Sequence, residues 1–123
     1  MTPEQYRVVY VEPGKPAREM MLGKDLKDLQ RAVGGLIELI YAHDDRTVIV
    51  GNDEAKLIGM EGNRRLETGS IIAGPFFIIG DGGEDFRSLT DAEVDRYLQH
   101  YAQSHEISQE EVQADMGWVF FSF

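Results

Sequence analysis

Two adjacent arginines follow an asparagine at Asn63, Arg64 and Arg65, in a chain that is otherwise acidic. A guanidinium group presents its donors in a planar fork that matches the oxygens of a carboxylate or a phosphate. We therefore treat these three residues as a candidate site for an anion or another small ligand. The structural alternative is that one arginine pairs with a carboxylate of the chain itself, while Asn63 fixes a turn by bonding to its own backbone.

Acidic residues gather in the second half of the chain, where residues 81–115 hold ten acids and two bases. Four of them lie on expected helices and form a candidate surface for a partner: Asp91, Asp95, Glu110 and Glu111. A partner that used this surface should be basic, because opposite charges steer association. One function of such a surface is to mimic nucleic acid as a decoy against a host defence enzyme. The structural alternative is a solvated helical face that aids solubility.

The remaining polar residues form no pattern typical of catalysis or metal binding. The chain has no cysteine, and its three histidines stand in different expected elements, whereas a metal site needs three or four ligands at fixed geometry. The acidic loop at residues 81–85 departs from the register of a calcium-binding loop, which requires acids and a glycine at fixed positions. We therefore expect no metal, no cofactor and no enzymatic activity.

Length and composition limit the class of protein further. A chain of 123 residues with 42% apolar residues is expected to form a single domain over residues 1–123. A net charge of −10 argues against direct binding of nucleic acid, which requires a basic surface. No apolar run is long enough for a membrane span, and the N-terminal residues show no secretion signal, so a cytoplasmic protein is expected.

The order of apolar patterns and turn residues predicts an α+β fold. We expect a mostly antiparallel sheet of about five to six strands, with two to four short helices on one side. Two capping boxes, beginning at Thr90 and Ser108, predict helix starts. A helix is also expected at 25–33, ended by Gly34 and Gly35, and a helical turn at 55–58. Strands are expected at residues 6–11, 17–22, 36–42, 47–51, 70–80 and 117–123.

Two of these strands carry specific expectations. The segment 70–80 is apolar on both faces apart from Pro75, so it should be a central strand with a bend or bulge at the proline. The segment 117–123 also has apolar residues on both sides and should not lie free in solvent. It should either become the last strand of the chain's own sheet or add to a neighbouring copy, which would make a homodimer through the tail.

A set of strand and turn motifs resembles a known family. The motifs are Val33–Glu38, Asn52–Leu57, Asn63-Arg64, Ile72–Gly80 and Asp85–Thr90. Together they resemble an uncharacterised domain of unknown function found in small phage, plasmid and conjugative-element proteins of gut bacteria. The resemblance covers about residues 6–100 and leaves residues 101–123 as a C-terminal helix and strand-like tail. It implies a bacterial mobile element as the source and brings no established activity.

These observations favour a non-enzymatic accessory or regulatory protein of a mobile element that acts by binding a protein partner. The acidic decoy and the small-ligand or anion binder at Asn63, Arg64 and Arg65 are the alternatives.

Overall fold

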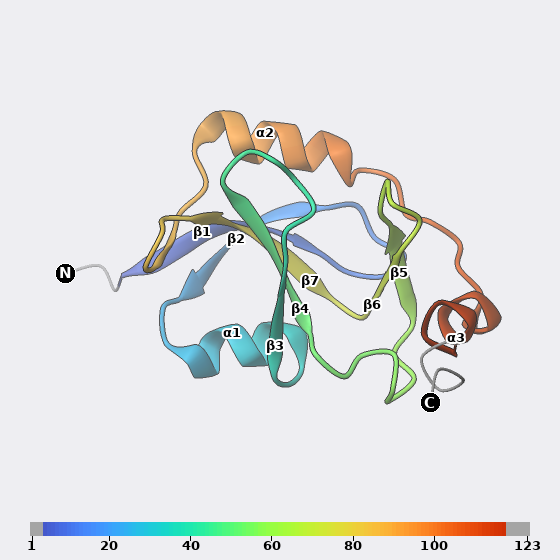
Figure 1. Cartoon of the computed structure of the whole chain (residues 1–123). Helices are drawn as coiled ribbons and strands as arrows, with labels where there is room; N and C mark the ends of the chain where they lie inside the picture. The colour runs from blue at the N-terminus through green and yellow to red at the C-terminus, as the bar shows by residue number, and fades with distance from the viewer. Residues whose placement is uncertain (1–3, 118–123) are drawn as a thin grey trace.

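An antiparallel sheet of six strands runs through the middle of the molecule, with a two-stranded ribbon beside it (Figure 1). The computed structural model describes residues 4–117. Hydrogen-bonded neighbours follow the order β2-β1-β7-β4-β3, and the short β8 pairs with the end of β7. The elements are β1 (Gln5–Val11), β2 (Arg18–Gly23), α1 (Leu26–Val33), β3 (Ile37–Ile40), β4 (Thr47–Asn52), β5 (Gly62–Arg65), β6 (Ile71–Ala73), β7 (Phe76–Asp81), β8 (Phe86–Arg87), α2 (Asp91–His100) and α3 (Gln109–Gly117). The predicted α+β fold with a mostly antiparallel sheet is confirmed.

The most apolar strand, β7, lies at the centre of the sheet. Ile78 of β7 stands opposite Val9 of β1 on one side and opposite Ile49 of β4 on the other. All six residues of β4 and the first five of β7 are buried. A strand covered on both faces is apolar throughout rather than alternating, so the run of apolar residues in β7 accounts for its central position.

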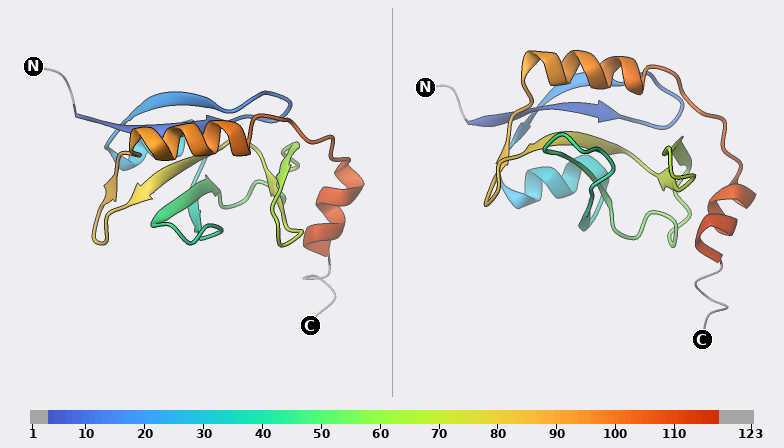
Figure 2. Two further views of the ribbon diagram at one scale, coloured as in Figure 1. Left: turned by 90° about the horizontal axis from the view of Figure 1, so that it is seen from above. Right: turned by 45° about the horizontal axis from the view of Figure 1, so that its top comes forward.

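Helices α1 and α2 cover opposite faces of the main sheet (Figures 1 and 2). This corrects the expectation that the helices lie on one side. Leu29 and Val33 of α1 pack with Val8, Val48 and other residues of one face. The opposite face is covered by α2 through a cluster of Val94 and Tyr97 with Val9, Val11, Ile49, Phe76 and Ile78. Because β7 and β4 are apolar on both faces, one layer of helices would have left half of this surface in water.

The segment predicted as one strand at 70–80 is divided between the two sheets. Residues 71–73 form β6 in the ribbon with β5, and residues 76–81 form β7 in the main sheet. Gly74 adopts a positive φ of 72°, and a Cβ there would stand 2.5 Å from the sulfur of Met60. Glycine tolerates this conformation and Pro75 cannot donate to a ladder, so these two residues separate the strands.

The predicted helix starts are confirmed. The hydroxyl of Thr90 accepts from the Glu93 amide at 3.2 Å, and the hydroxyl of Ser108 accepts from the Glu111 amide at 3.1 Å. Gly34 ends α1 in the left-handed conformation, as its place after the apolar stripe predicted. Residues 53–59, where a helical turn was expected, form a series of turns instead. The strand predicted at 117–123 falls almost wholly outside the described residues.

Candidate functional site

A cleft of about 650 Å³ lies between the β3–β4 end of the main sheet and the β5–β6 ribbon. Its walls are mostly apolar, with a few polar groups among them, which is the usual composition of a binding cleft. The lining residues are Glu38, Ile40, Gly51, Asn52, Asp53, Ala55, Lys56, Leu57, Leu66, Thr68, Ser70, Ile71, Ile72 and Ala73.

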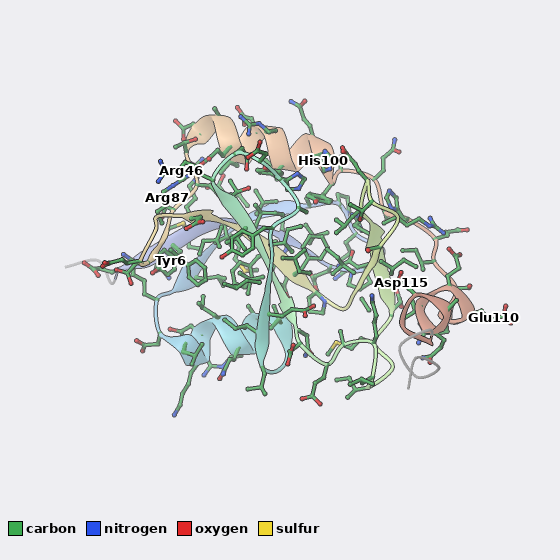
Figure 3. All side chains as sticks on the ribbon, viewed as in Figure 1. Tyr6, Arg46, Arg87, His100, Glu110 and Asp115 are labelled. Atoms are coloured by element: carbon green, nitrogen blue, oxygen red, sulfur yellow. The ribbon has the colours of Figure 1, made fainter. Side chains whose placement is uncertain are left out.

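The turn after β4 forms one wall of the cleft, and Asn52 fixes its path. The buried side chain of Asn52 donates to the Val33 carbonyl at 3.1 Å and accepts from the Glu54 amide at 2.7 Å. These bonds tie the turn to the end of α1. The opposite wall is held by α3, because the Asp115 carboxylate accepts from the Ile71 amide at 3.1 Å and pairs with Lys56. In Figure 3, Asp115 lies beside the ribbon, whereas Glu110 points away from it.

The charged groups at the cleft leave it acidic. Partial burial raises the pKa of Glu38 above its ordinary value, Asp53 raises it further, and Lys56 lowers it. Lys56 is itself paired with Asp115. Two carboxylates, Glu38 and Asp53, therefore face the cleft with the neighbouring cation already engaged. A titratable group shifted by burial in a cleft is a marker of a functional site.

β3 is the edge strand beside this cleft, and within residues 4–117 it has a hydrogen-bonded strand on one side only. Its side chains alternate between the two faces of the sheet. Glu38 and Ile40 line the cleft, while Ile37 and Leu39 line a second hollow of about 340 Å³ on the α1 face. A strand placed next to β3 would thus meet a hollow on each of its faces.

Of the predicted site residues, Asn63 and Arg64 are fully buried structural groups. The amide of Asn63 donates to the carbonyls of Val11 and Gly74 at 2.9 and 2.8 Å, so it joins β5 to the ends of other segments rather than bonding to its own backbone. Both side chains are 0% exposed. Neither presents a polar group to a ligand at the surface.

Arg64 is bonded to uncharged oxygens. Its guanidinium donates to Tyr101 O at 2.9 Å, to Lys15 O at 2.6 Å, and to Oδ1 and O of Asn63 at 2.8 and 3.2 Å. Among the described residues Arg64 has no carboxylate partner, and its Nε has no hydrogen-bond partner. Burial lowers the pKa of Arg64 below its ordinary value. Its charge lies at the C-terminal end of α2, where the helix dipole favours a cation.

Arg65 is the arginine that pairs with a carboxylate of the chain, as the structural alternative expected for one of the two. Its guanidinium contacts Glu111 of α3, and its backbone amide donates to Nδ1 of His105 at 3.0 Å. The structure therefore separates the predicted trio into two interior residues and one surface ion pair.

The four predicted partner-facing acids lie on two separate helices. Asp91 and Asp95 are exposed on α2, whereas Glu110 and Glu111 belong to α3 at another part of the molecule (Figure 1). Asp91 pairs with Arg7, and Glu111 pairs with Arg65. Two of the four charges are thus compensated by the chain itself, and this arrangement gives no specific support to a decoy of nucleic acid.

The cleft residues Glu38, Asp53 and Lys56 were not among the residues predicted to form a site. Glu38 precedes Asp53 by 15 residues and Lys56 by 18 residues. Only the pairing of β3 with β4, which places Glu38 opposite Gly51, brings Glu38 close to the turn after β4. Asp53 and Lys56 belong to the motif Asn52–Leu57, but there the sequence predicted only a helical turn at 55–58. No local pattern marks these three residues as neighbours.

A comparison with models of protein families matches residues 6–102 to a family described as Domain of unknown function (DUF3846). The match covers well over half of the chain, and the chain belongs to this family. Membership in an uncharacterised family over about residues 6–100 is therefore confirmed. No curated protein and no solved structure matches the chain.

Two further observations concern the described part of the chain. Its residues include no cluster of three or more histidines, cysteines or acids that could hold a metal ion. None of its helices has the length and apolar character required to cross a bilayer.

Proposed function

We propose that the chain is a non-enzymatic binding protein, and that an extended segment of a protein partner adds as a strand to the open edge of β3. The observation that carries this proposal is the edge strand with a hollow on each face. In strand addition, main-chain hydrogen bonds supply affinity and pockets for alternate side chains supply selectivity. β3 offers both elements.

The other edge of the sheet, β2, is a poorer candidate. Arg18 and Glu19 on β2 pair with Glu12 and Arg7, and charged side chains along an edge discourage the addition of another strand. β3 carries one exposed charged side chain, Glu38, and the large exposed side chains around it are apolar: Leu36, Leu39 and Tyr41 are 59%, 43% and 65% exposed. Large apolar groups gathered at an edge mark an interaction surface.

The charges of the cleft indicate the chemistry of the partner segment. The apolar walls favour large apolar side chains at every second position. Glu38 and Asp53 favour a lysine or arginine among them, because Lys56 is already paired with Asp115. We therefore expect an extended segment in which apolar residues alternate and one basic residue reaches the acidic mouth of the cleft.

The test is a selection of random peptides, displayed on phage, against the full chain. Enriched peptides should share alternating large apolar residues and a basic residue. Glu38→Gln should weaken their binding by about two- to fivefold, the effect of one exposed ion pair. The matched control is Glu54→Gln, since Glu54 is an exposed acid on the nearby turn after β4 and does not line the cleft.

Strand addition makes a further demand on the selected peptides. Methylation of the peptide nitrogens that face β3 should abolish binding, whereas methylation of the alternate nitrogens should have little effect, since only every second amide of an added strand bonds to the edge. Absence of enrichment, or peptides that bind equally well when Leu57→Asp places a charge on the cleft wall, would contradict the proposal.

The cellular setting is a separate part of the proposal. We place this binding role in an accessory or regulatory protein of a mobile element in a bacterial cytoplasm. Its support is the resemblance of the strand and turn motifs described above. Affinity purification from a bacterial lysate, with Leu57→Asp as the negative control, should recover a partner that depends on the cleft.

A further inference from the structure

We infer that a second copy of this chain occupies the β3 edge when no partner is bound, with the two β3 strands antiparallel about a two-fold axis that passes at Leu39. This arrangement deepens the proposed function and rests on it, because it uses the same open edge. It adds a competitor for that edge, which a partner segment must displace. Three features of β3 and its surroundings support it: the exposed apolar side chains, the direction of the backbone groups, and the position of the one charge.

Exposed apolar side chains are concentrated around the β3 edge. Among residues 4–115, whose side chains the structure describes, seven large apolar side chains are exposed, and only Met21 lies elsewhere, on β2 at the opposite edge of the sheet. The other six belong to α1, to β3 and its flanks, and to the turn after β4, which lie together in the lower part of Figure 1: Leu26, Leu36, Leu39, Tyr41, Leu57 and Ile58. These positions extend beyond the four residues of β3. A folded second copy can cover such a width, whereas one extended segment covers only the strand edge and its two hollows.

The backbone groups of β3 are arranged to pair with an identical strand. The Asp53 amide donates to the Leu36 carbonyl at 2.8 Å, so the backbone groups of Leu36 point toward the β4 side. These groups alternate in direction along an antiparallel strand, so those of Ile37, Leu39 and Tyr41 point to the open edge. With the axis at Leu39, the amide and carbonyl of the two Leu39 residues bond to each other. Ile37 of each copy then bonds in the same way to Tyr41 of the other, as an isologous interface requires.

The charge on β3 selects this register. The two registers that overlap most of β3 place either Glu38 or Leu39 on the axis. With Glu38 on the axis, two carboxylates would face each other directly, which is destabilising. With Leu39 on the axis, each Glu38 faces Ile40 of the second copy instead. Ile37, Leu39 and Tyr41 line one hollow on the α1 face, so their side chains from the two copies meet there in a continuous apolar surface.

The net charge of the chain makes this pairing reversible. Each copy carries a net charge of −10, so the two copies repel each other at long range. Two short strand edges form an interface of the small class, below about 1,200 Å² of buried surface, in which association is weak. A partner segment with a basic residue is attracted by the same charge that repels the second copy. It can therefore replace the second copy at the edge.

Sedimentation velocity of the full chain over a wide range of concentration tests the pairing. We expect a monomer–dimer equilibrium that shifts toward the dimer as salt is added, because salt screens the repulsion. Leu39→Asp and Leu39→Lys should each weaken association by about tenfold or more, since each places two like charges at the axis. An equimolar mixture of the two variants should recover association, because aspartate then faces lysine. Only a register with Leu39 opposite Leu39 gives this recovery.

Met21→Asp is the matched control for the charge itself. Met21 is 49% exposed on the opposite edge strand and Leu39 is 43% exposed on β3, so both changes place a carboxylate at a half-exposed edge position. Met21→Asp should leave association unchanged, and circular dichroism melts check that all three variants fold. A chain that stays monomeric at every concentration and salt contradicts the inference. Equal effects of Leu39→Asp and Met21→Asp, or a mixture of the two Leu39 variants that stays monomeric, also contradict it.

Glu38→Gln separates this inference from the proposed function. The change should weaken a selected basic peptide by about two- to fivefold but tighten the dimer, because it removes a repulsion between the copies. Added salt should likewise weaken the peptide and strengthen the dimer. If the chain dimerises through Leu39 while no peptide is enriched, the inference holds and the proposed function fails. If peptides bind to a chain that is monomeric under all conditions, the proposed function holds and the inference fails.

Discussion

Replacement of Arg64 by alanine should destabilise the domain far more than the same change at its neighbour Arg65. Arg64 is fully buried and donates to the carbonyls of Tyr101, Lys15 and Asn63 and to the side-chain oxygen of Asn63, at distances from 2.6 to 3.2 Å. These bonds join the end of α2, the turn between β1 and β2, and the start of β5.

The magnitude follows from the groups that the substitution leaves behind. Each buried acceptor without a donor costs about 1–3 kcal/mol, and the main acceptors are the oxygens of Tyr101, Lys15 and Asn63. Removal of a large buried side chain adds a cavity cost, typically about 2–5 kcal/mol. Relief of the buried charge works in the opposite direction by several kcal/mol. The net loss for Arg64→Ala should be about 3 kcal/mol or more.

Urea unfolding of three variants would check this value. Arg64→Met keeps most of the volume, so its difference from the wild type isolates the lost hydrogen bonds, and its difference from Arg64→Ala isolates the cavity. Arg65→Ala removes a pair whose two side chains are each 41% exposed, and it should cost about 1 kcal/mol or less. A loss for Arg64→Ala no larger than that for Arg65→Ala would refute the assignment of Arg64 as the group that holds these segments together.

Three further predictions concern other parts of the fold. Ile78→Asp should abolish the cooperative melt followed by circular dichroism, because it places an unpaired charge in the centre of β7; an unchanged melting temperature would contradict the central position. Thr90→Ala should lower the free energy of unfolding in urea by about 1 kcal/mol, since it removes the cap that accepts from Glu93 at 3.2 Å, whereas Thr68→Ala on an exposed loop should change it little. Burial, assisted by His100, lowers the pKa of His43 below its ordinary value of 6.5, although Asp45 opposes the shift. The unfolded chain therefore binds the proton more readily, so the free energy of unfolding should fall as the pH drops below about 6.5. His43→Gln should reduce the dependence of this free energy on pH, measured by urea unfolding between about pH 5 and pH 7.5. An unchanged pH dependence would exclude His43 as a contributor.

Much of the fold could be predicted because its signals are local. The capping boxes at Thr90 and Ser108 and the glycine stop at Gly34 depend on residues within one turn of a helix. The N-terminal hairpin and the pair β3–β4 are joined by short turns, so alternation and turn residues were sufficient to place them. The side of the sheet that each helix covers is not a local property. It depends on the packing of both faces of β7, and the sequence shows only that both are apolar.

The chemistry of Arg64 and Arg65 illustrates the same limit. Two adjacent residues of one type have opposite environments, because successive side chains of β5 point to opposite faces. Which one enters the interior depends on the position of the end of α2, 37 residues away along the chain. An exposed arginine pair was a reasonable expectation from charge alone. Only the packing of α2 against the ribbon turns one of the two into an interior donor.

The cleft results from the break at Pro75 in the apolar segment 70–80. The proline was visible in the sequence, but its effect on the fold differs from the one expected. Pro75 was expected to bend or bulge a single strand. Together with Gly74, it divides the segment instead, so that residues 71–73 leave the main sheet and pair with β5. The ribbon formed in this way stands beside β3 and supplies the wall at Ile71, Ile72 and Ala73. A continuous strand from 70 to 80 would carry these apolar residues along the central strand, away from β3. The same break that interrupts the most apolar segment of the chain therefore creates the surface on which we expect a partner to bind.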